Sequence, residues 1–199
     1  MLDVAVVGVG KVGATLSAAW HRAGLSVGLV ARNLDSSTMF SIAAEFGLPR
    51  LYLPEAARSA RVVVVADPRE SVADLFEDLR GVHASAIFID AASGPSDGDR
   101  FGAMRSLTTG APVYRAFNTL GWSDFVDPTY GGELPDVFYA GPDDDARDLV
   151  EGLVGCLAMR PVYVGGYDNV RLIDSLAELR DAVQAVRPGR RSRSACSNG

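Results

Sequence analysis

The sequence predicts a doubly wound α/β fold of the Rossmann type, in which helices cover both faces of a mostly parallel sheet. Short apolar runs alternate with segments of helical periodicity along most of the 199 residues, which is the pattern of strand–helix–strand units. The run Val62–Ala66, four valines and an alanine, is typical of a strand buried on both faces. A glycine-rich sequence at residues 8–13 follows the first apolar run and begins the first helical segment, the context in which such a sequence binds dinucleotides.

The first half of the chain is expected to alternate strand and helix four times. Strands are expected at residues 3–7, 26–30, 51–53 and 62–66, and helices at residues 11–23, 38–46, 54–60 and 71–79. The first helix repeats apolar residues at spacings of three and four and ends at Gly24, a residue that favours helix termination. Two serines precede the second helix as caps, Pro54 occupies the first turn of the third, and Val72 begins the apolar face of the fourth.

The second half continues the pattern and adds a small C-terminal extension. Strands are expected at residues 86–90, 113–117, 137–140 and 161–164, and helices from residue 143 and over residues 170–186. Three aspartates at 143–145 suit the positive end of the helix that they begin. The apolar residues of the last helix are expected to face inward: Leu172, Ile173, Leu176, Leu179 and Val183. We expect one domain over residues 1–186, with the strand–helix extension starting at about residue 146.

Composition and charge exclude several classes of function. Hydrophobic residues make up 48% and charged residues 22%, which is typical of a folded protein. The net charge is −6 although residues 187–199 carry four arginines, so the rest of the chain is a poor partner for nucleic acid. We expect this basic tail to be disordered. No apolar run approaches a membrane helix, no signal peptide is evident, and Cys156 and Cys196 suggest no metal site; a cytoplasmic protein is expected.

The glycine-rich sequence is the strongest functional signal. It reads Gly8-Val9-Gly10-Lys11-Val12-Gly13. In a dinucleotide site Gly8 allows the tight turn, Gly10 the approach of the backbone to pyrophosphate, and Gly13 the close packing of helix on strand. The first turn of the helix supplies N–H groups and partial positive charge to the phosphates. The alternative is a glycine-rich turn that binds nothing.

The end of the second strand favours NADP(H) over NAD(H). NAD sites usually place an acidic residue there to bind the ribose 2′-hydroxyl. This chain has Ala31-Arg32-Asn33, and a guanidinium suits a 2′-phosphate by charge and geometry. A solvent-facing arginine without a ligand is the alternative interpretation.

Three further loops are expected at the same edge of the sheet, where ligands bind in such folds. Their candidate binding residues are Ala66, Asp67, Pro68, Ser93, Asn118, Leu120 and Trp122. No residue pattern indicates a general acid, a general base or a nucleophile, since His21 and His83 lie in an expected surface helix and a loop. Hydride transfer needs alignment of the reactants more than a dedicated base.

With these segments in place, the chain resembles the NADP oxidoreductases that use coenzyme F420, a deazaflavin hydride carrier. The resemblance runs from Val4 to about Val183 and rests on linked segments: the glycine motif, Ala31-Arg32, Ala66-Asp67-Pro68, residues 115–121 (RAFNTLG), 139–144 (YAGPDD), 161–166 (PVYVGG) and 171–176 (RLIDSL). It implies hydride transfer between nicotinamide and deazaflavin rings stacked in the crevice. Residues 8–13 would then bind pyrophosphate and Arg32 the 2′-phosphate, with Asn118, Leu120 and Trp122 around the rings and Pro68 shaping the wall.

Two other functions stay open from the sequence. One is an NADPH-dependent reductase of a small carbonyl or imine, and the other is a redox sensor that binds NADP(H) without turnover. The partners expected are small molecules, with no nucleic acid and no membrane. The apolar last helix, together with the family resemblance, also predicts a homodimer.

Overall fold

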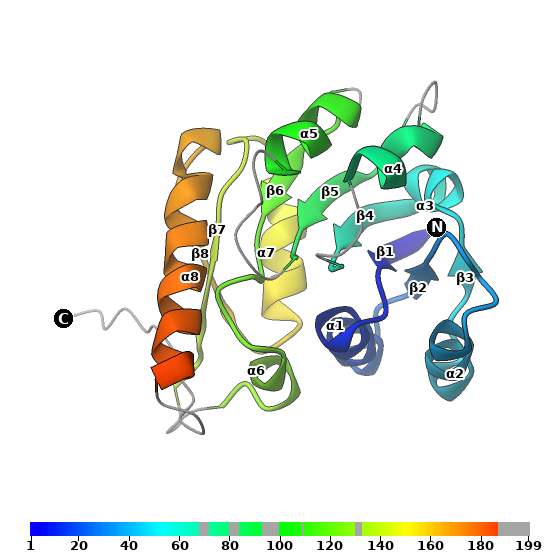
Figure 1. The fold of residues 1–199 in the computed structure, drawn as a ribbon, viewed down its shortest axis with the longest axis horizontal. Helices are drawn as coiled ribbons and strands as arrows, with labels where there is room; N and C mark the ends of the chain where they lie inside the picture. The colour runs from blue at the N-terminus through cyan, green and yellow to red at the C-terminus, as the bar shows by residue number, and fades with distance from the viewer. Residues whose placement is uncertain (68–71, 80–83, 93–99, 109, 130–132, 187–199) are drawn as a thin grey trace.

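A computed structural model describes residues 1–67, 72–79, 84–92, 100–108, 110–129 and 133–186. Its main feature is a six-stranded sheet in the order β3-β2-β1-β4-β5-β6, with every neighbouring pair parallel (Figure 1). The strands are β1 (Leu2–Val7), β2 (Val27–Val30), β3 (Arg50–Leu51), β4 (Ala60–Val65), β5 (Ile87–Asp90) and β6 (Val113–Arg115). The predicted doubly wound fold is confirmed, with the strand order reversing between β1 and β4.

The centre of the sheet explains the valine-rich runs. Val6 of β1 pairs with Leu29 of β2 on one side and with Val64 of β4 on the other. Val62 to Val65 are each no more than 1% exposed, because helices pack on both faces of these strands. A parallel strand in this position needs apolar side chains at every residue rather than at alternate residues.

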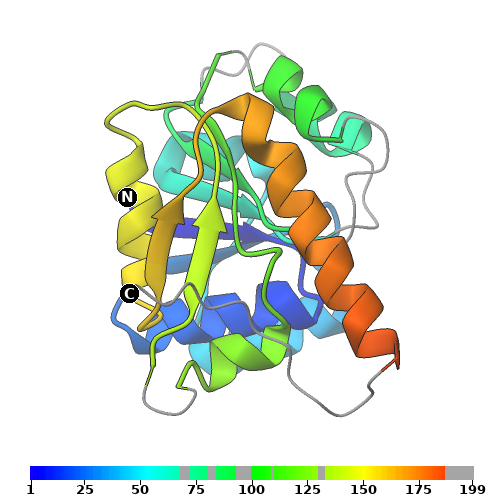
Figure 2. The ribbon, with the colours of Figure 1, turned by 90° about the vertical axis from the view of Figure 1, so that its left-hand side faces the viewer.

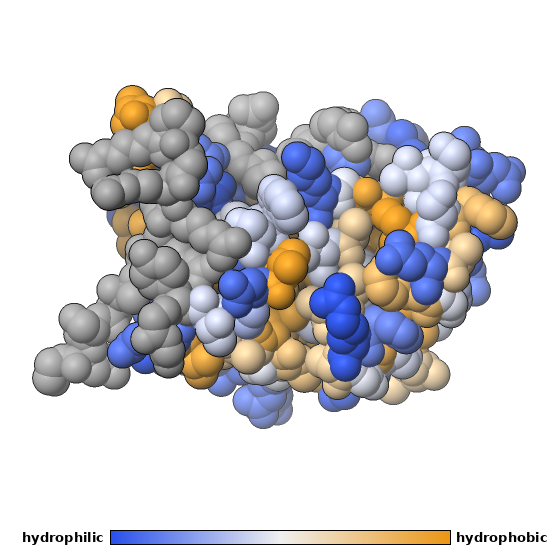
Figure 3. All heavy atoms as spheres, turned by 90° about the horizontal axis from the view of Figure 1, so that it is seen from below, coloured by the Kyte–Doolittle hydropathy of each residue, from blue (hydrophilic) through white to orange (hydrophobic). Residues whose placement is uncertain are grey.

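Two layers of helices cover the sheet (Figure 1). One apolar cluster joins it to α1 (Lys11–Arg22), α2 (Ser37–Phe46), α6 (Trp122–Val126) and α7 (Arg147–Gly155). The other joins it to α3 (Leu53–Ser59), α4 (Val72–Phe76), α5 (Arg100–Leu107) and α8 (Val170–Val186). Seen from the side of α1, α2 and α6, hydrophilic and hydrophobic residues are interspersed over the surface (Figure 3).

The C-terminal part adds a second, two-stranded parallel sheet. It consists of β7 (Asp136–Tyr139) and β8 (Arg160–Tyr163), paired throughout. Figure 2 shows these strands side by side, with α7 along one side and α8 along the other. A single antiparallel bridge between Arg115 and Ala140 connects this sheet to the end of β6. Among the described residues, no helix combines the length and hydropathy that crossing a bilayer requires.

Several boundaries differ from the sequence prediction. Helices α5 and α6 were not predicted, and Trp122 begins α6 instead of lying in a loop. Strand β6 ends at Arg115 because the chain turns at Phe117, whose φ is +66°. The fourth helix ends at Phe76 and continues as a 3-10 turn over Glu77–Leu79.

The orientation of α8 differs from the prediction. Leu172 and Leu179 are 47% and 61% exposed, so the expectation that they face inward was wrong. The inward face consists of Val170, Ile173, Asp174 and Ala177. The buried Arg115 of β6 needs a carboxylate partner, and Asp174 supplies it. This pairing turns the Asp174 side of α8 inward in place of the leucine side.

Candidate functional site

The candidate site lies where the strands of the large sheet end. Because parallel strands finish at the same edge, the loops that follow β1, β2, β4, β5 and β6 meet there. The structure brings most of the predicted binding residues to these loops: residues 8–13 after β1, 31–33 after β2, Ala66 and Asp67 after β4, and Asn118, Leu120 and Trp122 after β6. Pro68 and Ser93 fall outside the described residues.

The three motif glycines have different surroundings. Gly8 has φ +96°, and a Cβ added there would lie 2.7 Å from Cβ of Asp67. A Cβ at Gly13 would lie only 2.0 Å from the carbonyl oxygen of Gly8. A Cβ at Gly10 would meet no atom within 4 Å. Gly8 and Gly13 are therefore required by the fold itself, whereas the space beside Gly10 is left open by the protein.

The beginning of α1 offers donors toward that open space. Gly10 is the N-cap residue, and no side chain caps the helix. The N–H groups of the first turn have no partner within a helix and carry its positive dipole end. Between the glycines, Val9 and Val12 are half-buried and Lys11 is exposed. A backbone without a side chain at Gly10, next to N–H donors that have no partner within the helix, suits a phosphate group.

The loop after β2 contains the predicted Arg32, and a second guanidinium that sequence analysis missed, from Arg50, contacts this loop. Arg32 and Asn33 are exposed and Ala31 is half-buried. Arg50, at the start of β3, donates from Nη1 to the carbonyl oxygen of Leu34 at 2.6 Å. Parallel pairing of β3 with β2 brings Arg50 to this loop. The register sets Arg50 opposite Leu29, next to the last residue of β2, and a register of this kind has no signal in the local sequence.

A buried ionic network forms the far end of the site, where β5 and β6 finish. Arg115 Nη1 lies 3.1 Å from Asp90 Oδ2, and both side chains are fully buried. Arg115 also donates from Nε to Asp174 Oδ1 of α8 at 2.8 Å. Arg100, at the start of α5, lies 3.4 Å from Asp90 Oδ1. Each buried charge thus has an opposite charge beside it, which burial requires.

The arginines at this end also bind backbone carbonyl groups of three loops. Arg100 Nη2 donates to Asp67 O after β4, at 3.1 Å. Arg115 Nη1 donates to Ala92 O after β5, at 3.0 Å. Arg180 Nη1, from α8, donates to the carbonyl oxygens of Asn118 and Leu120 after β6, at 2.8 and 2.6 Å. The loops are therefore held together by guanidinium groups, and none of these arginines was among the predicted site residues.

Two buried polar atoms on the loop after β6 have no hydrogen-bond partner among the described residues. They are Oδ1 of Asn118 and Oγ1 of Thr119, in side chains that are 1% and 3% exposed. Buried polar atoms are normally hydrogen-bonded, and leaving them unpaired is costly. These adjacent atoms give the loop after β6 hydrogen-bonding capacity that the described residues leave unused.

Trp122 connects this loop to the glycine motif. It begins α6, which packs against α1, and its side chain is 45% exposed. The Lys11 Nζ lies 5.5 Å from the centre of the Trp122 ring, within the range of a cation–π contact. Two parts of the candidate site, the glycine-rich turn and the loop after β6, are thus neighbours.

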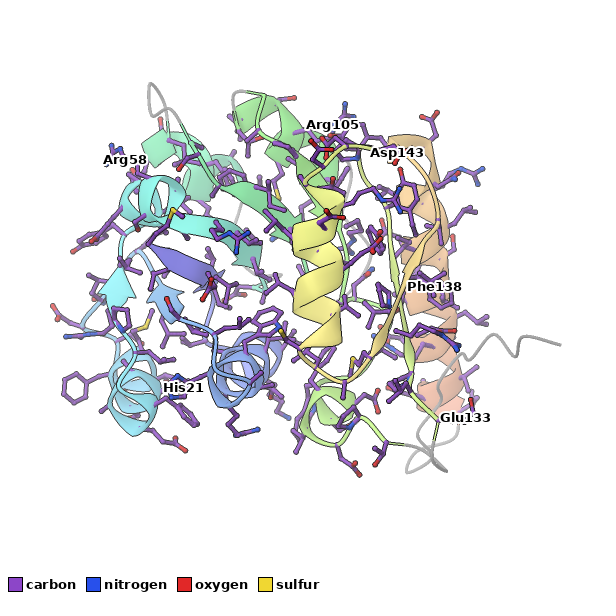
Figure 4. The ribbon with its side chains drawn as sticks, turned by 180° about the vertical axis from the view of Figure 1, so that it is seen from behind. His21, Arg58, Arg105, Glu133, Phe138 and Asp143 are labelled. Carbon is purple, nitrogen blue, oxygen red and sulfur yellow. The ribbon has the colours of Figure 1, made fainter. Side chains whose placement is uncertain are left out.

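The site contains no evident acid–base machinery among the described residues. His21 lies on α1 (Figure 4), and its ring packs 6.1 Å from that of Phe46. His83 is outside the described residues. Burial raises the pKa of Tyr139 to about 12, with a hydrogen bond to Glu151 adding to the effect, but Tyr139 belongs to β7 in the smaller sheet. No cluster of metal-binding side chains occurs in the part of the chain that the structure describes.

Comparison with known proteins finds a family match over the first part of the chain. Residues 3–94 match the family described as NADP oxidoreductase, coenzyme F420-dependent, which confirms the predicted resemblance over that part of the chain. No curated protein matches the sequence.

Similar solved structures share the fold. A candidate F420-dependent NADP reductase from Arthrobacter sp. FB24 aligns over 94% of each chain with a TM-score of 0.76 and 21% identity. A reductive aminase from Aspergillus terreus, in complex with NADPH and ethyl-5-oxohexanoate, has a TM-score of 0.69 and 16% identity over 94% of this chain and 62% of its own. An imine reductase from Streptomyces aurantiacus has a TM-score of 0.66 and 19% identity, over 92% and 62%. The present chain thus spans about three-fifths of the imine-reducing enzymes.

Proposed function

Because residues 3–94 match a family of NADP oxidoreductases that depend on coenzyme F420, we propose that this protein transfers a hydride between NADP(H) and a deazaflavin of the F420 type. The observation that carries the proposal is the pairing of two features. Gly10 faces a space that the protein does not fill, and the neighbouring loop after β6 ends in buried, unpaired polar atoms. A phosphate at one end and a polar planar ring at the other would satisfy both.

In this proposal the loops divide the dinucleotide between them. Residues 8–13 bind the pyrophosphate through backbone N–H groups, and Arg32 binds the 2′-phosphate, with Arg50 adding positive charge to the same loop. Ala66 and Asp67 form the wall beside the nicotinamide ribose. Asn118 and Leu120 lie around the nicotinamide, and Trp122 bounds the space in which the second ring stacks.

The chemistry itself belongs to the two cofactors, since nicotinamide and deazaflavin exchange a hydride directly when bound face to face. The protein then needs no proton donor. Its own residues bind the two molecules, hold the loops rigid and exclude water, and such alignment supplies a large part of the rate in reactions of this kind. The buried charged side chains at the strand ends are paired with one another, as Arg115 is with Asp90 and Asp174, which suits a role in holding the loops.

A second candidate is an NADPH-dependent reductase of a small imine or carbonyl compound. The likeness to the reductive aminase bound to NADPH favours it, because the Rossmann part would then bind the same cofactor. A third candidate, a sensor that binds NADP(H) without turnover, would have the same nucleotide site and no hydride acceptor.

The experiment that separates these candidates follows the deazaflavin absorbance of oxidised coenzyme F420 during incubation with the protein and NADPH, with NADH in parallel. Rapid loss of absorbance with NADPH, and little with NADH, is the expected result. Gly10→Ala is the binding-deficient control. Its added Cβ has room in the fold, so the variant should stay folded and lose activity through weaker binding of NADPH. Unchanged absorbance, in protein shown to bind NADPH, would contradict the deazaflavin and direct the search to imines and carbonyl compounds.

We further propose that two copies of the chain associate through α8. Its outer side carries a stripe at alternating spacings of four and three residues: Leu172, Leu176, Leu179, Val183 and Val186. All five are exposed or half-buried, and α8 runs along one side of the molecule (Figure 2). This spacing is that of a helix seam that packs against a second helix with the same pattern, and a twofold axis would supply one.

A further inference from the structure

We propose that α8 orients the amide of Asn118, so that Asp174 and Arg180 are positioning residues for the nicotinamide end of the site. In this arrangement Asn118 Oδ1 is presented as the acceptor for an N–H donor on a planar ring, and the carboxamide of nicotinamide carries such a donor. The inference rests on the proposed binding of NADP(H). It adds to the proposed site two residues of α8, Asp174 and Arg180, which lie about 60 positions after the loop that they contact.

The orientation of the Asn118 amide follows from the chemistry of its neighbour. Asn118 Nδ2 lies 3.2 Å from Asp174 Oδ1, to which it donates. A carboxylate can only accept hydrogen bonds, so the amide nitrogen must face Asp174 and the amide oxygen must turn away from it. That oxygen is buried and has no partner among the described residues. Asp174 therefore determines that the group of this side chain left without a partner is an acceptor.

Asp174 is itself held rigidly. Arg115 contacts its Oδ1 through both Nε and Nη2, each at 2.8 Å. Arg115 is fully buried and also lies against Asp90 at the end of β5. Because the guanidinium plane is rigid, the carboxylate has little freedom to rotate away from Asn118. Contacts from β5 and β6 therefore fix Asp174 of α8, and Asp174 in turn fixes the Asn118 amide.

Arg180 fixes the backbone of the same loop. Its Nη1 donates to the carbonyl oxygens of Asn118 and Leu120, and its side chain is only 9% exposed. The loop begins with Phe117 at a φ of +66°, a conformation that costs a residue with a Cβ about 1–3 kcal/mol and persists only when its surroundings impose it. Arg180 supplies part of that constraint from outside the loop.

The composition of α8 supports a positioning role over a general packing role. Two of its leucines face outward, while an aspartate and an arginine face inward toward the loop. Apolar residues of similar volume usually stabilise a protein as well as a buried ion pair does. Stability alone therefore does not explain why the inward face of this helix is charged.

The test measures preference between two ligands that differ at the carboxamide alone. The ligands are NADPH and its 3-acetylpyridine analogue, in which a methyl group replaces the carboxamide NH2. Adenosine 2′,5′-bisphosphate, which has the 2′-phosphate and no nicotinamide, reports on the other end of the site. Wild-type protein is expected to bind NADPH about three- to tenfold more tightly than the analogue, the contribution of one hydrogen bond.

In the variants Asp174→Ala, which removes the acceptor for Asn118 Nδ2, and Asn118→Ala this preference is expected to fall to about one, while the affinity for adenosine 2′,5′-bisphosphate stays within twofold of wild type. Arg180→Lys, which keeps the charge and loses the two-carbonyl contact, is expected to reduce the preference with an intact fold. Glu178→Gln, at an exposed position of α8, is the matched control and should keep it.

The outcomes separate the inference from the proposed function. A wild-type preference that persists in Asp174→Ala and Arg180→Lys would overturn the positioning role while leaving NADP(H) binding intact. Equal affinity of the wild-type protein for NADPH and the analogue would overturn the acceptor role of Asn118. Wild-type protein that binds neither NADPH nor adenosine 2′,5′-bisphosphate would overturn both the inference and the proposed function.

Discussion

The substitution Gly10→Ala is expected to weaken NADPH binding about 10- to 100-fold with little effect on stability. Gly10 has φ −68° and ψ −179°, angles that alanine adopts without strain, and its added Cβ would meet no atom within 4 Å. Replacing glycine restricts the unfolded chain and stabilises the fold by about 0.4–1 kcal/mol. Alanine is a poorer N-cap than glycine by roughly 0.5–1 kcal/mol. The two effects nearly cancel, so the melting temperature should change by no more than about 3 °C.

The effect on binding has a different origin. The alanine methyl group occupies the space through which the backbone would approach the pyrophosphate. Loss of one hydrogen bond to a charged group costs about 1.5–3 kcal/mol, which corresponds to roughly 10- to 100-fold in Kd. Calorimetric titration with NADPH measures this directly, and thermal unfolding of the same samples measures stability.

Gly13→Ala is the comparison that tests the reasoning. Its Cβ would lie 2.0 Å from the Gly8 carbonyl oxygen, so the helix and the turn must move apart. Overpacking of this kind costs about 1–3 kcal/mol or more, and a melting temperature lower by about 5 °C or more is expected for a chain of this length. A Gly10→Ala variant that binds NADPH within threefold of wild type, at an unchanged melting temperature, would refute the placement of pyrophosphate beside Gly10.

Three other predictions concern separate parts of the molecule. Arg32→Ala should weaken NADPH binding by about 10- to 100-fold and NADH binding by less than threefold, because one ligand alone has a 2′-phosphate; equal losses for both would contradict its role. Leu179→Glu, at a side chain that is 61% exposed, should convert a dimer to a monomer in light scattering, and a wild-type monomer would exclude the α8 interface. The pKa of Tyr139 is raised to about 12 by burial and its bond to Glu151, so the neutral phenol is favoured in the folded state. Its stabilisation should be complete below pH 10 and decline between pH 10 and 12, and Tyr139→Phe should show a smaller decline in urea unfolding over that interval.

The sequence predicted the large sheet well because the signals there are local. A run such as Val62–Val65 identifies a strand buried on both faces, and the glycine spacing identifies the turn between β1 and α1. Both depend on residues that are adjacent along the chain. The loops that carry Arg32, Asp67 and Asn118 were located for the same reason, since they follow recognisable strands.

The arginine network and the orientation of α8 could not be predicted in this way. Helix α8 has two possible inward faces, and the leucine pattern pointed to the wrong one. The choice depends on Arg115, which lies 59 residues before Asp174, and on the need of a buried guanidinium for a carboxylate partner. Such a pairing has no local pattern, because any of several aspartates could serve until the topology brings one to the end of β6.

These non-local contacts have a consequence for the site as a whole. Arg100, Arg115 and Arg180 bind carbonyl groups of the loops after β4, β5 and β6, and each arginine comes from a different element. The positions of the three loops are therefore coupled through the fold and do not depend on a bound ligand for their relative placement. Hydride transfer requires two rings to be aligned at contact distance, and a site that is formed before binding loses less free energy in ordering itself. In the proposed site, Trp122, at 45% exposure, lies outside this network, so a substitution there is expected to affect the second substrate without moving the three loops.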